Sequence, residues 1–342
     1  MATMKDVALQ AGVSTTTVSH IINDTRHVSE ELRQRVSDAI AALNYQPHGP
    51  ARSLRTKQTR TIGMIIPDNS NPFFAEVARS VEDAAFENNY SVILCNSDGS
   101  VKKELNYVRL LIEKGVDGLA FISAGKDPQS IEMLVRQSIP WVVADREIPG
   151  ADVDVAVDEV LVENLAGGFK ATEYLISLGH KRIGCIAGPF QLTPSAQRLM
   201  GYKQALQGAG FTVDPDLIIQ GDFHSRSGYE NCRALAALSD PPTAIFACND
   251  LMAIGALKAA HDLGLSIPQQ LSIVGFDDIA WSSFSIPRLT TIAQPKQEMG
   301  RLLTALLVER IKDDQLTHRR INLPVNLIMR DSCAALSSIN AP

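Results

Sequence analysis

Residues 4–23, MKDVALQAGVSTTTVSHIIN, decide the fold of the N-terminal part, because they contain two short helical patterns that meet at Gly12. In the second pattern Val18, Ile21 and Ile22 recur at helical spacing and give the helix one apolar face. A helix this short is stable only when its apolar face packs against other helices. The stretch therefore predicts a helix-turn-helix at the start of the chain.

The opposite face of the second predicted helix is polar. Hydroxyl, imidazole and amide groups at the front of a short helix can reach base edges and phosphates in a DNA major groove. Taken alone, the stretch also fits an ordinary helical hairpin with a solvated polar face. The polar residues of this face, which we take as candidate DNA contacts, are Thr15, Thr16, Ser19, His20 and Asn23.

A third helical pattern follows, in which Leu32, Val36 and Ile40 form one apolar stripe. Three helices in a stretch of this length make a minimal core of the helix-turn-helix kind. We therefore predict a small all-α DNA-binding domain over residues 1–47, called the head below. Tyr45, near its end, is counted among the candidate DNA contacts.

The charge of the chain is divided unevenly. The net charge is −6, but residues 1–60 carry eight Lys and Arg against five Asp and Glu, which leaves −9 for the remainder. Residues 48–60, HGPARSLRTKQTR, contain four basic residues and no acid. A basic head on an acidic body is typical of a small nucleic-acid-binding domain joined to a larger domain with another task.

A short helical pattern, PARSLRT, occupies residues 50–56. A helix of this length is marginal alone in water, because nucleation is costly, so we predict that it forms when the protein binds DNA. Leu54 is an aliphatic residue among arginines, with Arg55 beside it. Such a leucine can be wedged between base steps in a minor groove, although a helix packed on the body is the alternative. Residues 48–60 are therefore assigned as a hinge helix or linker.

The head followed by ARSL resembles the LacI/GalR family of transcriptional repressors, and within it the ribose and purine repressors. The resemblance extends over essentially the whole chain. It implies that Leu54 intercalates in the minor groove, with Ala51 and Arg55 in the same groove. It also implies a homodimer on a pseudo-palindromic operator with a central CG step. The residues implied to contact the major groove are Thr15, Thr16, His20 and, just beyond the helix, Arg26.

From Thr61 onward, apolar strand-like runs alternate with helical patterns. The runs are TIGMIIP (61–67), YSVILCN (90–96), DGLAFIS (117–123), WVVAD (141–145), KRIGCIAG (181–188), DLIIQGD (216–222), TAIFACND (243–250) and LSIVGFDD (271–278). Continuous apolar strands separated by helices indicate parallel sheets covered on both faces. Because these units exceed one sheet, we predict two doubly wound α/β lobes. The body, residues 61–342, is divided into an N-lobe of about 61–162 and 292–323 and a C-lobe of about 163–291 and 324–342.

Polar and aromatic residues stand at the ends of the predicted strands. In open α/β sheets, ligands bind at the carboxyl ends of the strands. Carboxylates accept hydrogen bonds, arginines donate them, amides do both and rings stack on C–H faces, a combination that suits a sugar. Each residue alone also fits a structural loop, and an adjacent Asp-Arg pair alone fits a surface ion pair. The candidate ligand-binding residues are Asn71, Phe73, Phe74, Asp145, Arg146, Arg198, Phe223, Asn249, Asp277 and Gln294.

These residues match the ribose-binding pattern of periplasmic pentose-binding proteins, to which the body is similar. The purine-type repressors tend to carry Asp-Trp where this chain has Asp145 and Arg146. The resemblance therefore implies a periplasmic-binding-protein-like body and a small sugar effector, D-ribose or a related pentose, that acts as an inducer. The alternatives are a purine-type repressor with a nucleobase corepressor, and a sugar-binding receptor without a gene-regulatory role.

The sequence carries no signature of catalysis, of a cofactor or of a membrane protein. It has no P-loop, no GxSxG, no HExxH and no Gly-rich dinucleotide turn, so we expect neither an enzyme nor a bound cofactor. It shows no secretory signal and no apolar run near the roughly 18 residues of a membrane span. Five cysteines without CxxC or Cys/His spacing indicate a reducing cytoplasm and no metal site. The C-terminal residues lack a leucine heptad, so we expect a dimer without a tetramerising coiled coil.

Overall fold

The computed structural model describes residues 2–23, 26–45, 58–122, 128–146 and 157–336. The chain forms two units, Met1–Thr59 and Arg60–Pro342. The hinge helix predicted at residues 50–56 lies outside the described ranges. No helix within those ranges is both long enough and apolar enough to cross a membrane.

The described part of the head folds into three helices, which confirms the predicted helix-turn-helix. They are α1 (Met4–Ala11), α2 (Thr15–Asn23) and α3 (Glu30–Ala42). The chain turns between the first two at Gly12, whose φ of 63° is a left-handed conformation that glycine adopts without strain. Val7, Val18 and Val36, each 0% exposed, join the three helices in one core.

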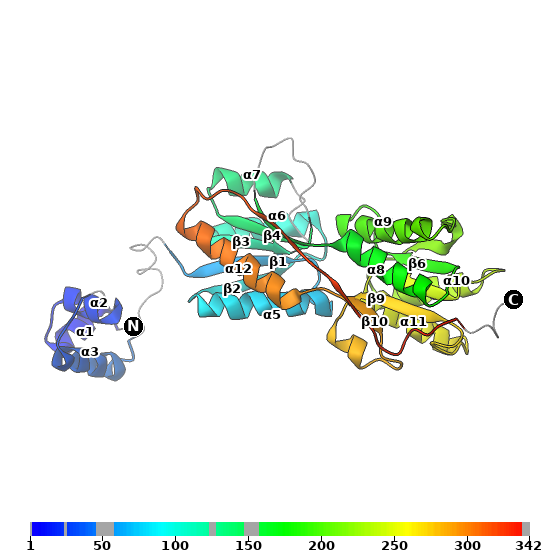
Figure 1. The fold of residues 1–342 in the computed structure, drawn as a ribbon. Coiled ribbons are helices and arrows are strands. Elements are labelled where there is room, and N and C mark those ends of the chain that lie inside the picture. The colour runs from blue at the N-terminus through cyan, green and yellow to red at the C-terminus, as the bar shows by residue number, and fades with distance from the viewer. Residues whose placement is uncertain (1, 24–25, 46–57, 123–127, 147–156, 337–342) are drawn as a thin grey trace. The chain divides into compact units, whose positions relative to one another are not determined.

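The N-lobe is built on a sheet with the strand order β11-β5-β4-β3-β1-β2, whose described pairs are all parallel. Its strands are β1 (Thr61–Ile66), β2 (Ser91–Asn96), β3 (Gly118–Ile122), β4 (Trp141–Ala144), β5 (Asp158–Val162) and β11 (Arg320–Leu323). Its helices are α5 (Pro72–Glu87), α6 (Val101–Glu113), α7 (Pro128–Arg136) and α12 (Lys296–Lys312). Along β3, Ala120 and Ile122 join the apolar cluster of α5 and α12, whereas Leu119 and Phe121 join that of α6 and α7 (Figure 1). Both faces of the sheet are covered, which explains why its strands are continuously apolar.

The C-lobe is built on a second sheet with the order β12-β10-β9-β8-β6-β7, parallel except for β12 against β10. Its strands are β6 (Ile183–Ala187), β7 (Ile218–Gln220), β8 (Ala244–Ala247), β9 (Ser272–Asp277), β10 (Thr290–Ala293) and β12 (Asn326–Ile328). Its helices are α8 (Asn164–Ser177), α9 (Thr193–Gly208), α10 (Ser225–Ala236) and α11 (Asp250–Asp262), with the 3-10 turns η1 (Pro215–Leu217) and η2 (Ala280–Ser283). The predicted class, a helical head followed by two α/β lobes, is confirmed.

Within the described ranges the chain crosses between the lobes after β5, after β10 and after β11 (Figure 1). The sequence places the second crossing near residue 292, but Thr290–Ala293 forms β10 of the C-lobe sheet, so this crossing comes after Ala293. The strands β5, β10, β11 and β12 have no counterpart in the sequence prediction. β5 begins with two acids, Asp158 and Glu159, which interrupt the apolar pattern although both are buried.

Candidate functional site

The polar face of α2 carries the candidate DNA contacts of the head. Thr15 and Thr16, in its first turn, are exposed, and Ser19 and His20, one turn later, are half-buried. At about 100° per residue these four side chains occupy one side of the helix, opposite the side that enters the head core. This side is therefore a partly exposed polar face, as the predicted DNA contacts require.

The other candidate DNA contacts differ in their positions. Arg26 is exposed just beyond α2. Tyr45 is only 6% exposed and belongs to the core of the head, so the structure gives its ring a packing role instead of a place on the surface. The side chain of Asn23, and the residues Ala51, Leu54 and Arg55, lie outside what the structure describes.

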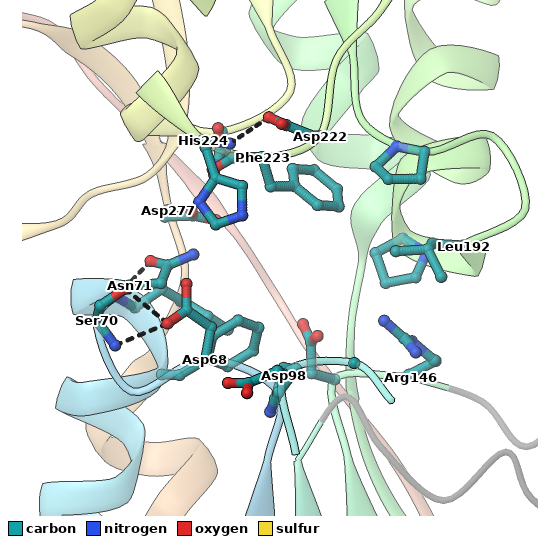
Figure 2. A pocket seen from close by; sticks show the side chains of 18 of the residues that line it. Asp68, Ser70, Asn71, Asp98, Arg146, Leu192, Asp222, Phe223, His224 and Asp277 are labelled. Atoms are coloured by element: carbon teal, nitrogen blue, oxygen red, sulfur yellow. Dashed lines mark hydrogen bonds between the residues drawn. The ribbon is translucent and has the colours of Figure 1, made fainter. Parts of the chain in front are cut away.

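A cavity of about 500 Å³ lies in the body, where residues that follow strands of both sheets meet (Figure 2). Gln294 does not line it, but its Nε2 donates a hydrogen bond of 2.7 Å to Oδ1 of Asp277, which does. The structure thus brings the predicted ligand residues, all of them in described segments, to one place. Those that line the cavity are Asn71, Phe73, Phe74, Asp145, Arg146, Arg198, Phe223, Asn249 and Asp277.

Phenyl rings give the cavity its apolar surfaces. Phe73 and Phe74, in the first turn of α5, meet edge to face with their centroids 5.1 Å apart. Phe223 follows β7, and its ring packs against Gly188, where a Cβ atom would lie 2.2 Å from the ring. A side chain at position 188 would therefore push this ring out of place. Rings of this kind can cover the C–H faces of a bound sugar.

The two asparagine side chains that line the cavity also begin helices. Asn71 Oδ1 accepts a hydrogen bond of 3.0 Å from the N–H of Phe73 at the start of α5. Asn249 Oδ1 accepts one of 3.0 Å from the N–H of Met252 at the start of α11, and its Nδ2 donates to the carbonyl of Phe223 at 2.9 Å. Each oxygen keeps a second lone pair and each amide keeps at least one N–H, so both can still donate to a ligand and accept from it.

Arg198 of α9 is held on three sides. It is 4% exposed, and its Nε donates to Asn164 Oδ1 at 2.8 Å while one terminal nitrogen donates to the carbonyl of Cys248 at 2.6 Å. The same nitrogen lies 3.5 Å from Asp277 Oδ1. The guanidinium also stacks over the ring of Phe276, 3.7 Å from its centroid. This fixed orientation suits a planar group that must present N–H donors to a ligand.

Asp277 ends β9 and is 3% exposed. Burial raises the pKa of its carboxyl to about 8, against the opposing charge of Arg198. Its side chain accepts from Gln294, and its backbone carbonyl accepts a hydrogen bond of 2.8 Å from Lys296 Nζ. Gln294 and Lys296, which follow β10 where the chain crosses back to the N-lobe, therefore hold both the side chain and the main chain of Asp277.

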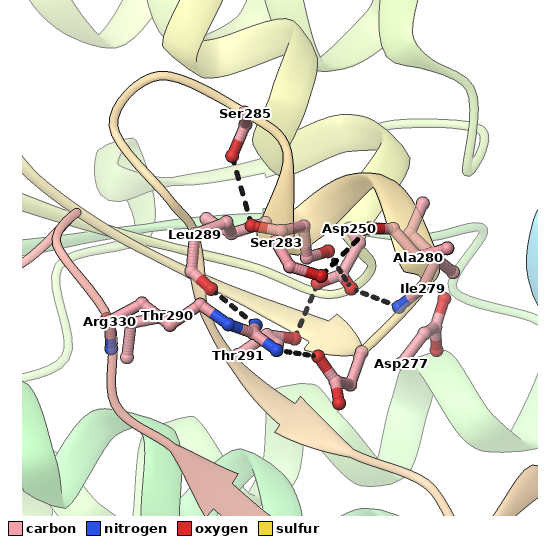
Figure 3. A network of polar contacts seen from close by, with 12 residues as sticks. Asp250, Asp277, Ile279, Ala280, Ser283, Ser285, Leu289, Thr290, Thr291 and Arg330 are labelled. Carbon is pink, nitrogen blue, oxygen red and sulfur yellow. Dashed lines mark hydrogen bonds and ion pairs between the residues drawn. The ribbon is translucent and has the colours of Figure 1, made fainter.

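A second buried carboxylate fixes the loop behind Asp277. Asp250, 0% exposed, accepts hydrogen bonds from the N–H of Ile279 at 2.9 Å, from Ser282 Oγ at 2.6 Å and from Thr291 Oγ1 at 2.5 Å (Figure 3). Burial raises the pKa of Asp250 to about 6, and these hydrogen bonds oppose the shift. The network joins the start of α11, η2 and β10, so the strand end that carries Asp277 is held rigidly.

Asp145 and Arg146 supply charges from the N-lobe. Burial lowers the pKa of the Arg146 guanidinium, and the nearby carboxylates of Asp145 and Glu104 oppose this shift. Asp145 has a φ of 69°, and the same left-handed backbone recurs at Phe223 (69°) and Asp277 (116°). Each such non-glycine residue costs roughly 1–3 kcal/mol, and residues of this kind gather at ligand sites. Strained strand ends on both lobes therefore support a binding site.

Sequence reasoning missed several polar residues that line the cavity. Asp68, Asp98 and Asp222 follow β1, β2 and β7, so the rule that found the others also applies to them. Their carboxylates also serve their own loops, as where Asp68 Oδ1 accepts from the N–H of Ser70 at 2.9 Å. A turn-forming role was therefore an equally good explanation. The missed polar residues are Asp68, Ser70, Asp98, Gln191, Asp222 and His224.

Family models match both parts of the chain. Residues 3–48 match the model of bacterial regulatory proteins of the lacI family. Residues 172–333 match the model of a periplasmic binding protein-like domain. The first match coincides with the helical head, and the second covers most of the C-lobe together with α12 and β11 of the N-lobe.

Full-length relatives and solved structures agree with these matches. The chain is 42% identical to the ribose operon repressor of Escherichia coli over 97% of this chain and 100% of that protein. It is 40% identical to the HTH-type transcriptional repressor PurR of Photobacterium profundum over 98% of this chain and 100% of that protein. A LacI family transcriptional regulator from Enterococcus faecium with bound ribose is 32% identical, with a TM-score of 0.73 over 81% of this chain and 100% of that one. The Lac repressor dimer bound to operator and the anti-inducer ONPF is 28% identical, with a TM-score of 0.86 over 98% and 99%.

Proposed function

This chain belongs to the lacI family of bacterial regulatory proteins and is a DNA-binding transcriptional repressor with an effector-binding domain, and we propose that its effector is D-ribose, acting as an inducer. The family is not enzymatic, so the cavity binds its ligand without transforming it. We propose further that the protein works in the cytoplasm as a homodimer on a pseudo-palindromic operator. The solved Lac repressor dimer with its operator supports this arrangement.

The observation that supports a sugar ligand is that each wall of the cavity pairs a carboxyl group with a guanidinium group. Asp145 and Arg146 come from the N-lobe, and Arg198 and Asp277 come from the C-lobe. A sugar hydroxyl both donates and accepts, so it can bridge a carboxylate and a guanidinium. On the N-lobe wall, the charges of Asp145 and Arg146 also compensate each other when water leaves the cavity. A polyhydroxylated ligand fits this arrangement better than an apolar one.

Position 146 favours a pentose over a nucleobase. A flat base gains most from stacking on a large aromatic ring, and the purine-type repressors tend to carry tryptophan where this chain has Arg146. A guanidinium whose pKa burial has lowered gains most from hydroxyl oxygens that accept its N–H groups. The relative that was solved with bound ribose supports the same choice.

We propose that ribose acts by changing the relation between the lobes. A ligand that contacts both walls changes the position of one lobe relative to the other, and so the conformation of the three crossing segments. This changes the spacing of the two hinge segments in the dimer. Because a short hinge helix is marginal, a small change of spacing can remove its pairing on DNA. A coupling free energy of roughly 1–3 kcal/mol is enough for a useful switch.

Two titrations test the proposal on the full-length protein. Fluorescence anisotropy with an operator selected from a random DNA library measures DNA binding, and calorimetry measures the binding of D-ribose and hypoxanthine. We expect ribose to bind and to weaken operator binding. Arg146→Trp should lose ribose binding, whereas the control Arg136→Trp, at an exposed position of α7, should keep it.

Other outcomes would overturn parts of the proposal. Binding of hypoxanthine that tightens operator binding would make the protein a purine-type repressor. Tighter operator binding with ribose would reverse the sign and make ribose a corepressor.

A further inference from the structure

A lysine outside the cavity joins its two walls. Lys296, the first residue of α12, is 9% exposed, so its ammonium group must be compensated by neighbours. Its Nζ donates to the backbone carbonyls of Asp277, at 2.8 Å, and of Asp278. It also lies 3.3 Å from Glu76 Oε2 on α5 of the N-lobe. One cation is thus shared between a strand end of the C-lobe and a helix of the N-lobe.

Glu76 makes a second contact with the C-lobe. Its other carboxylate oxygen, Oε1, accepts a hydrogen bond of 3.2 Å from the N–H of Ala280, at the start of η2. Glu76 lies one helical turn beyond Phe73, which lines the cavity. The carboxylate therefore joins α5 to the loop after β9 as well as to Lys296.

The backbone at this point needs the cation. Asp277 and Asp278 have φ values of 116° and 54°, a conformation that side-chain-bearing residues rarely adopt. It turns two successive carbonyl groups toward the Lys296 ammonium group, which satisfies both of them. Without the lysine these two carbonyl groups would lose a charge-assisted partner, and the strand end could relax.

The lysine acts on a residue of the effector site without touching the cavity. Among the described residues that line the cavity are Asp277, Phe73 and Asn71, but neither Lys296 nor Glu76 is one of them. Asp277 presents its carboxyl group to the ligand from the backbone that Lys296 holds. The helix that carries Glu76 begins with Asn71 and Phe73.

We propose that Lys296 and Glu76 are positioning residues of the effector site: the ion pair between them fixes the backbone of Asp277 against α5 and so sets the affinity for the effector. This inference rests on the proposed effector function of the cavity. It assigns a role to two residues that neither contact the ligand nor belong to the DNA-binding head.

The test compares effector affinity among variants of the full-length protein by calorimetry. Lys296→Met should weaken ribose binding by about tenfold or more, because hydrogen bonds to a charged group are lost behind Asp277. Glu76→Gln should weaken it in the same direction by a smaller factor, and Lys296→Arg, which keeps a cation, should restore most of the affinity. Lys258→Met is the matched control, because this lysine pairs with Asp262 on the surface of α11, away from the cavity.

A double-mutant cycle separates positioning from general stability. If the two residues act as one pair, Glu76→Gln added to Lys296→Met should cause no further loss of affinity. Additive losses, or wild-type affinity in Lys296→Met, would overturn the inference. Thermal unfolding of each variant shows whether it folds. If Lys296→Met does not fold, the ribose affinity of Glu76→Gln tests the inference instead.

Parallel titrations with D-ribose and hypoxanthine keep the two proposals distinct. The unaltered protein decides which compound is the effector. The ratio of variant to unaltered affinity for that compound decides the role of the pair.

Discussion

Asp277→Asn should remove the pH dependence of folding stability that the buried Asp277 carboxyl group causes. Burial raises the pKa of the Asp277 carboxyl from its ordinary value of 3.8 to about 8. Between these two values the folded protein keeps the proton and the unfolded chain has lost it, so stability falls as the pH rises through this window. Asparagine cannot ionise, and it retains the oxygen that accepts from Gln294.

The size of the effect follows from the two pKa values. From pH 6 to pH 8 the unfolded chain gains roughly 3 kcal/mol from ionisation, whereas the folded protein recovers less than about 1 kcal/mol near its own pKa, so the net loss of stability is about 2 kcal/mol. The pKa of Asp250 is raised only to about 6, so its contribution lies mostly below this window. Burial lowers the pKa of His180 below its ordinary value of 6.5, so this residue makes stability rise with pH, mostly below pH 6.5.

Urea unfolding of effector-free protein at pH 6, 7 and 8 measures this difference. The unaltered protein should lose about 2 kcal/mol more than Asp277→Asn between pH 6 and pH 8. Asp222→Asn is the control, since it changes an exposed carboxylate of the same cavity. Equal pH slopes for the unaltered protein and Asp277→Asn would refute the reasoning, because the Asp277 carboxyl would then ionise alike in both states.

Further substitutions test packing, the cavity and the hinge. Gly188→Ala should weaken ribose binding, since its Cβ would lie 2.2 Å from the ring of Phe223; unchanged affinity in calorimetry would argue against a role for that ring. Gly168→Ala should lower the free energy of unfolding by about 2 kcal/mol or more, because its Cβ would lie 2.1 Å from the backbone oxygen of Arg198; urea denaturation measures it, and a neutral result would contradict tight packing of α8 on α9. Leu54→Ala should weaken operator binding in anisotropy titrations and leave ribose affinity unaltered; equal operator affinity would remove the wedge.

The part of the cavity that could be predicted from the sequence is the part that follows one topological rule. Parallel strands end at the same edge of a sheet, so residues after each apolar run, such as Asp145 and Asn249, are brought together by the fold alone. Asp68 and Asp222 obey the same rule, but an acid after a strand also stabilises a turn. Only the arrangement in space shows that their loops face the cavity.

Among the strands that the prediction missed, β5 shows that buried charged residues interrupt the apolar pattern by which strands are predicted. β5, DEVLV, opens with Asp158 and Glu159, which read as polar residues. Asp158 is 0% exposed and lies 3.1 Å from Arg310, and Glu159 lies 2.6 Å from Arg320. The arginine partners lie about 150 residues or more away in the chain. The ion pairs that allow these two acids to be buried could therefore not be predicted from the neighbouring sequence.

The same distance along the chain explains how the lobes can act on each other. Each sheet is completed by a strand from the C-terminal part of the chain, the first by β11 and the second by β12, so neither lobe is one continuous stretch of sequence. The second crossing, which carries Gln294 and leads directly into Lys296, holds Asp277 by its side chain and its main chain. If the effector binds the Asp277 carboxyl as we propose, it contacts the residue that this crossing segment holds, and Lys296 connects that residue to Glu76 of α5. Since β1 begins at Thr61 and leads into α5, we infer that a shift of α5 would also affect the first strand of the body.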